Sequence, residues 1–157
     1  MNDTDTRTVK KESVADILER NSDSTIESWI SSVERNEELT ALPLNYQERT
    51  SHLPLLLDDL VRRLRLAPDA KVTVSSAARE HGILRHAQGY TVPMIVEEFR
   101  ILQVSIFITL HNNLANVDFR IVMLDVATIA DEMDSQLKQA MLGFLEPLGT
   151  ESGSLSA

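Results

Sequence analysis

Residues 77–102, which read AAREHGILRHAQGYTVPMIVEEFRIL, decide how the helices of this chain are ordered. A helix that ends near Gln88 is favoured because Gly89 can adopt the left-handed conformation that closes a helix. A second helix then begins at once, with Thr91 as its cap and Pro93 in its first turn. The stretch therefore predicts two helices joined by a tight turn.

Helical patterns continue on both sides of this turn. Apolar residues recur at intervals of three and four, which is the spacing of one helix face, and no run alternates as a half-buried strand does. Pro54 predicts a kink or a break, since an interior proline removes a backbone hydrogen bond. Ser22 or Asp23 is the expected cap of the second helix. The expected helices cover residues 13–20, 22–39, 45–66, 75–88, 91–114 and 118–145.

These patterns predict an all-α fold, a single domain of five to six helices, globin-like or a helical bundle, with a long C-terminal helix. The helical domain is expected at residues 13–146. Residues 1–12 and 147–157 are polar and lack periodicity, so they are expected to be flexible tails. The helix at 91–114 is apolar on most faces, which favours a place at the centre of the domain.

Composition restricts the partners of the chain. A formal net charge of −9 opposes binding to phosphate backbones and to anionic lipid, so neither nucleic acid nor a membrane is expected as a partner. The absence of cysteine excludes disulfides and thiol chemistry. No apolar leader or membrane-spanning run is present. We expect a soluble cytoplasmic protein.

A cluster of polar residues lies around the predicted turn. His81, Arg85 and Gln88 share one helix face because they are four and then three residues apart. The simplest interpretation is a network of interhelical hydrogen bonds in which Arg85 pairs with Glu97 or Glu98. A signal-responsive or partner-binding surface and phosphorylation of His81 are the alternatives. The predicted network comprises His81, Arg85, Gln88, Gly89, Tyr90, Glu97, Glu98 and Arg100.

Two residues near this cluster have expected packing roles. Gly82 allows a neighbouring helix to approach closely, and Tyr90 is expected to fill the corner between two helices.

No residue pattern marks a catalytic or metal site. Neither a histidine kinase motif nor a phosphotransfer motif surrounds His81, and no two histidines have the i, i+4 spacing that holds one metal ion. We therefore expect no catalytic residues, no metal and no cofactor. The alternative is a small-ligand or haem-binding protein of globin-like fold, with its pocket between the third and fifth helices.

The last predicted helix carries a long apolar stripe. Such a stripe can pack on the core of its own chain or pair with its copy in a dimer. The positions expected at a dimer or output seam are Val122, Val126, Ile129, Met133 and Leu137.

The His-Gly, Gln-Gly-Tyr and Glu-Phe-Arg elements of residues 77–102, in that order, resemble the RsbRD-type N-terminal domain family. The helix around Trp29 and the helix at 53–64 extend the resemblance to roughly residues 15–144. The family comprises RsbT co-antagonist regulators of bacterial stress signalling, and its domain also precedes histidine kinase modules. The resemblance implies a globin-like, cofactor-free sensory domain that dimerises and whose last helix leads into an output module.

We therefore expect a non-catalytic sensory or regulatory domain that forms a homodimer and passes a signal to an output domain or a regulatory protein. Since the family's output module does not follow Phe144, the chain is expected to be an isolated domain of a longer signalling protein. A natural stand-alone regulator and a module that acts on a partner in trans are the alternatives.

Overall fold

The structure is a computed structural model that describes residues 11–146, and all regular elements in this range are helical. The predicted all-α domain with a long C-terminal helix is confirmed. The parts of the predicted tails at residues 1–10 and 147–157 lie outside the described residues. The elements are α1 (Val14–Arg20), α2 (Ser22–Glu34), α3 (Glu37–Thr40), α4 (Tyr46–Thr50), α5 (Leu53–Leu64), α6 (Ser76–Ala87), α7 (Val92–His111), the 3₁₀-helix η1 (Leu114–Asn116) and α8 (Phe119–Phe144).

Two of the expected helices are each in two pieces. The expected break at Pro54 is confirmed: α4 ends at Thr50, and Pro54 lies in the first turn of α5, where its missing N–H costs nothing. The helix expected at 22–39 ends earlier, because the side chain of Asn36 accepts a hydrogen bond from Leu39 N and starts α3. The cap of α2 is Asn21, not Ser22 or Asp23.

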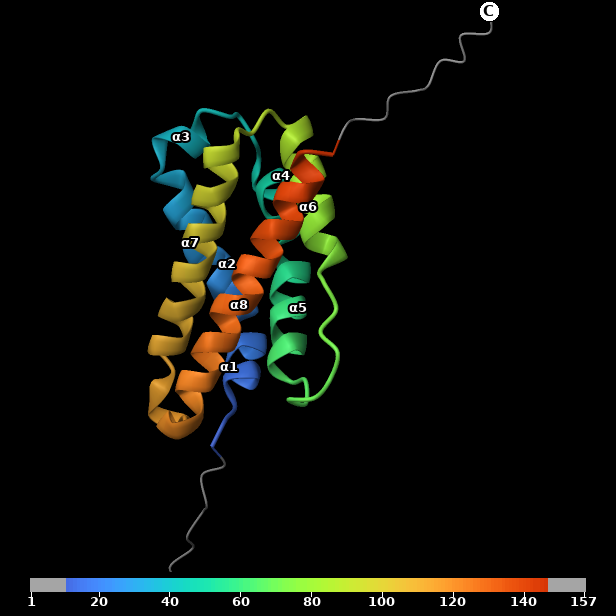
Figure 1. The fold of residues 1–157 in the computed structure, drawn as a ribbon. Helices are drawn as coiled ribbons and strands as arrows, with labels where there is room; N and C mark the ends of the chain where they lie inside the picture. Colours follow the sequence, from blue (N-terminus) through green and yellow to red (C-terminus); the bar gives the residue numbers. More distant parts are fainter. Residues whose placement is uncertain (1–10, 147–157) are drawn as a thin grey trace, which may run out of the picture.

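The helices form a bundle around α7 and α8 (Figure 1). These two helices run antiparallel and are joined through η1 at the lower left of the view. α8 packs on α5, α6 and α7, and its most extensive contact is with α6. α2 packs on α7, while α1 lies against α5 and α7. The core between them is mostly aliphatic, with Trp29 as its largest fully buried side chain.

α6 and α8 approach each other at the level of their backbones. A methyl group at Gly82 would overlap the carbonyl of Ala140, and one at Gly143 would overlap the carbonyl of Arg79. The prediction that Gly82 permits a close helix approach is therefore confirmed, and Gly143 is its counterpart on α8. Each helix places a glycine where the other presents backbone, so neither can slide past the other without a clash.

The apolar side chains of α7 and α8 are covered differently from what the sequence predicts. α7 is not buried all round, because Val96, Val104 and Ile108 are each about half exposed. On α8 the predicted seam faces the core of its own chain: Val122, Ile129 and Met133 are buried, and Val126 and Leu137 pack against them. Periodicity identified an apolar face of α8, but that face is already covered by α5, α6 and α7.

Most of the exposed apolar side chains of α8 lie instead in its first turns. These are Phe119, Ile121, Met123 and Leu124, while Leu142 near the end of the helix is also exposed. No helix within residues 11–146 is both long enough and apolar enough to cross a bilayer.

Gly82→Ala is expected to lower the free energy of unfolding by about 1–3 kcal/mol or more, because the new methyl group overpacks the contact with α8. In an unobstructed helix the same change raises the free energy of unfolding by about 1 kcal/mol. A loss of stability therefore indicates the close contact with α8, and a gain contradicts it. Urea unfolding followed by circular dichroism measures it. The exposed α8 variant Lys138→Ala is the control and should change stability by less than about 0.5 kcal/mol.

Candidate functional site

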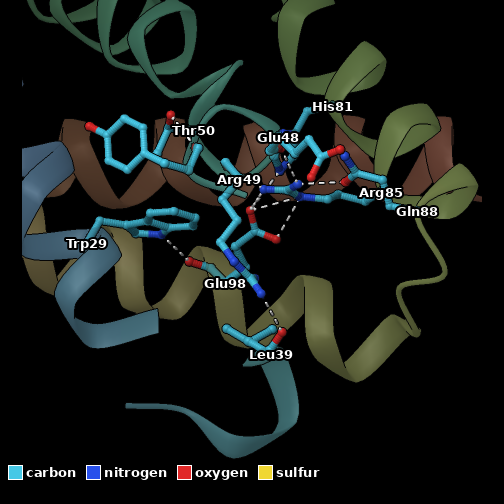
Figure 2. A network of polar contacts seen from close by, with 10 residues as sticks. Trp29, Leu39, Glu48, Arg49, Thr50, His81, Arg85, Gln88 and Glu98 are labelled. Atoms are coloured by element: carbon cyan, nitrogen blue, oxygen red, sulfur yellow. Dashed lines mark hydrogen bonds and ion pairs between the residues drawn. The ribbon is translucent and has the colours of Figure 1, made fainter. Parts of the chain in front are cut away.

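The guanidinium of Arg85, on α6, is the centre of a buried polar network (Figure 2). The Arg85 residue is fully buried, with 0% of its surface exposed. Its Nε lies 3.1 Å from both carboxylate oxygens of Glu98 on α7, and its Nη2 lies 2.6 Å from Glu98 Oε1. Nη1 donates to Gln88 Oε1 and to the carbonyl of Glu48, and Nη2 also donates to the carbonyl of Arg49. One side chain therefore connects α4, α6 and α7.

Glu98 receives hydrogen bonds from several directions. Its Oε1 lies 3.2 Å from His81 Nε2, and its backbone carbonyl accepts a hydrogen bond from Trp29 Nε1 of α2. Burial raises the pKa of this carboxyl, but His81 and Arg85 outweigh burial and hold the pKa of Glu98 below its usual value. Glu98 is therefore held by two helices: α6 contacts its buried carboxylate through Arg85 and His81, and α2 contacts its backbone carbonyl through Trp29.

The turn after α6 has the geometry that the sequence predicts. Gly89 has a φ of 91°, Gly89 N donates to the carbonyl of His86, and Tyr90 N donates to the carbonyl of Arg85. These two bonds satisfy the last carbonyls of α6 in a Schellman arrangement. The turn thereby places Tyr90 against the network.

Tyr90 packs directly on the buried charge. The Arg85 Cζ atom lies 4.7 Å from the centre of the Tyr90 ring, which is a cation–π distance. Burial, together with the nearby charge of Glu98, raises the pKa of Tyr90 to about 12. Tyr90 is 4% exposed, so it fills the corner between α6 and α7 as predicted.

Glu97 and Arg100 lie outside the network. They form an exposed ion pair at 2.6 Å, and Glu97 also accepts a hydrogen bond from the Asn36 amide. Of the two predicted partners of Arg85, Glu98 is therefore the actual one. Adjacent helical residues point in directions about 100° apart, so only one of the two glutamates can face α6.

Arg49 is a member of the site that the sequence did not reveal. It is 6% exposed, and its Nη2 donates to the carbonyls of Leu39 and Leu42. Arg49 thus holds the α3–α4 segment, while its own carbonyl accepts from Arg85. A single arginine in a short polar helix has no periodic signal, and its acceptors are backbone atoms that every residue possesses.

The histidines do not form a metal site. The rings of His52 and His81 lie 5.4 Å apart in an edge-to-face arrangement, while His86 packs on Phe144 elsewhere. Burial, followed by the proximity of His81, lowers the pKa of His52. Within residues 11–146 no group of three His, Asp or Glu side chains is placed to hold a metal ion.

The space beside His81 offers no room for haem. The void between α5 and α7, lined by Trp29, Leu56, His81 and Leu102 among others, is too small to hold a water molecule. Side chains thus fill the region in which the alternative, haem-binding interpretation places its pocket.

The network can fix helices but is closed to substrates. Its charged groups are each at most 3% exposed at the side chain, and they are directed at one another.

No protein-family model, curated protein or solved structure matches the chain.

Replacing Glu98 with glutamine should lower the free energy of unfolding by about 3–5 kcal/mol, because it leaves the buried guanidinium of Arg85 without a counter-charge. The neighbouring Glu97→Gln is a matched control, since it removes only an exposed ion pair and should cost at most about 1 kcal/mol. Both values come from urea unfolding at neutral pH. Equal losses for the two variants would contradict the assignment of Glu98 as the anchor.

Proposed function

We propose that this chain is a non-catalytic sensory or regulatory domain of a signalling protein, which passes a signal through α8 to an output domain or a partner protein. The resemblance of residues 77–102 to the RsbRD-type family supports this function. The structural observation that carries it is the backbone-level contact of α6 with α8 at Gly82 and Gly143. A shift of α6 must move α8, because neither helix has side-chain slack at that contact.

The Arg85 network links the same pair of helices to the rest of the domain. It joins α6 to α4 and α7 through charge-assisted hydrogen bonds, which are stronger and more directional than apolar contacts. α7 is in turn joined to α2 through Trp29. α8 is thus mounted on a framework of four helices, which is a suitable basis for switching between two discrete packings.

The closed nature of the network supports a non-catalytic role. A general acid, base or nucleophile has to come within hydrogen-bond distance of its substrate. The carboxylate of Glu98, the guanidinium of Arg85 and the Nε2 of His81 are instead occupied by one another.

We place the homodimer interface on the outer face of α7 and the first turns of α8. Val104 and Ile108 of α7 are about half exposed, and Met123 and Leu124 of α8 are each 72% exposed. The end of α7 and the start of α8 lie side by side (Figure 1). An exposed apolar surface formed by two packed helices is typical of a self-association site, and a second copy related by a two-fold axis would cover it with the same residues.

The double variant Met123→Glu and Leu124→Glu is expected to convert a dimer, with twice the 17.6 kDa mass of the chain, into a folded monomer. Light scattering gives the mass, and circular dichroism gives the helix content. Leu55→Glu, at an exposed apolar position on α5, is the control and should remain dimeric. A wild-type monomer, or a dimer that survives the double variant, would refute this interface.

Arg85→Lys tests the coupling to α8, because lysine keeps the charge but loses the fork of hydrogen bonds. Hydrogen exchange should become faster in the second half of α8 as well as in α6 and α7. Arg100→Lys, in the exposed ion pair, should leave α8 unchanged. Faster exchange confined to α6 and α7 would show that α8 is not coupled to the network.

A further inference from the structure

A second polar cluster surrounds an open groove at the other end of α6. The groove has a volume of about 380 Å³ and lies between α5, the connection from α5 to α6, the start of α6 and the middle of α8. The connection runs beside α5 at the right of Figure 1. This volume falls in the range of small-molecule sites. Its charged lining residues are Asp59, Arg62, Arg63, Lys71 and Glu132.

Asp59 and Arg62 are already engaged with the protein. Asp59 Oδ1 accepts from Arg62 at 2.7 Å, and its Oδ2 accepts from the hydroxyl of Ser75, the cap of α6, at 2.6 Å. Asp59 therefore orients one wall of the groove and leaves no carboxylate oxygen without a donor.

Two basic residues of the groove remain available to a ligand. Lys71 is exposed and forms no ion pair with any residue in the range 11–146. Arg63 has only a weak contact to Asp131, at 3.4 Å, and its buried Nε has no hydrogen-bond partner in the described part of the chain. These two side chains form a cationic edge with unused donors.

Glu132 of α8 is the carboxylate of the groove. It is only 4% exposed, and its Oε1 accepts a hydrogen bond from Gln136 at 3.0 Å, while no donor within residues 11–146 reaches its Oε2. Burial raises the pKa of this carboxyl above its usual value. Its Oε2 is not among the fully buried atoms that lack a partner, so it can be reached from the groove. A ligand that supplies a positive charge there would stabilise the ionised form, which burial disfavours and which Arg63 alone does not fully offset.

We propose that this groove binds a small zwitterion, an amino carboxylate whose ammonium group lies against Glu132 and whose carboxylate group lies against Arg63 and Lys71. A simple anion would meet Glu132 and the overall negative charge of the protein. A simple cation would meet Arg63 and Lys71, the two basic side chains of the groove that are not held by a strong ion pair. A ligand that carries both charges finds an opposite charge for each of its groups among these side chains.

Binding at this groove does not depend on the proposed function. Only the conclusion that binding acts as a signal rests on that function. A bound zwitterion would bridge the α5–α6 connection and α8, and it would do so close to the start of the helix on which α8 is packed. The signal recognised by the domain is then a small amino-acid-like molecule.

The probes are the ω-amino acids from glycine to 6-aminohexanoate, because the spacing of the two charges selects the member that fits. The carboxylic acid and the amine of equal chain length are the singly charged controls, and inorganic phosphate tests a plain anion site. Binding is measured on the full chain from the amide shifts of Ser76 and Gln136. We expect at least one ω-amino acid to saturate and to bind at least about tenfold more tightly than its singly charged analogues. Equal binding of an analogue or of phosphate, or no saturation by any ω-amino acid, would overturn the proposal.

Two variants locate the ligand. Lys71→Gln, at an exposed position, should weaken binding at least about tenfold without changing stability. Glu132→Gln should weaken binding and also remove the part of its pH dependence that follows Glu132, because wild-type affinity should rise with pH as the Glu132 carboxyl ionises, above the range in which the probe's own carboxyl ionises. Lys138→Gln, exposed on α8 and outside the groove, is the control with unchanged binding. Unchanged affinity in Glu132→Gln would rule out the site.

The mass of the chain is measured in the same samples. A dimer that binds no zwitterion would overturn the ligand site alone, whereas a monomer that binds one would overturn the proposed dimer alone.

Discussion

The pairing of Arg85 with Glu98 is the constraint on which the arrangement of the helices depends. Arginine stays charged when it is buried, so the fold must supply acceptors for all five of its N–H groups. Glu98 and Gln88 supply the side-chain acceptors, and the carbonyls of Glu48 and Arg49 supply the others. These carbonyls belong to the last turn of α4, where a helix leaves its carbonyls without internal partners.

The break before Pro54 and the buried arginine therefore explain each other. A continuous helix through this region would use the carbonyls of Glu48 and Arg49 internally, and Arg85 would lose two acceptors. Pro54 opposes that continuation at the next carbonyl, that of Thr50, since its ring has no N–H to donate there and clashes with that turn. The free end of α4 then becomes an acceptor for α6. A buried ion pair contributes less to net stability than to fixing one arrangement, and here it fixes the positions of α4, α6 and α7.

Sequence patterns predicted the helices well because each has an apolar face with a period near 3.6, and they predicted the turn at Gly89 because its chemistry is local. The spacing of apolar residues did not separate Glu98 from Glu97, since Ile101, four residues after Glu97, and Leu102, four residues after Glu98, are both buried. The role of Arg49 was not accessible, because its acceptors are backbone carbonyls brought near by tertiary folding.

Periodicity also left the partner of each apolar face undetermined. The stripe of α8 that includes Ile129 and Met133 is covered by the same chain, whereas Val104 of α7 and Met123 of α8 are left exposed. Both outcomes have the same spacing in the sequence. What separates them is the direction in which α8 crosses the bundle, and this direction depends on the backbone contact at Gly82 and Gly143.

The two polar clusters differ in a way that assigns them different roles. Every donor of Arg85 has an acceptor, so a ligand could bind there only by breaking bonds that already exist. In the groove, Glu132 Oε2 has no donor and Arg63 Nε has no acceptor within the described chain, so a ligand there adds interactions without removing any. A ligand shifts a conformational equilibrium only through a difference in its affinity for the two states. Under the proposed function, the fully hydrogen-bonded Arg85 side chain therefore serves as the frame that holds α6, and the groove beside α8 serves as the place where a signal enters.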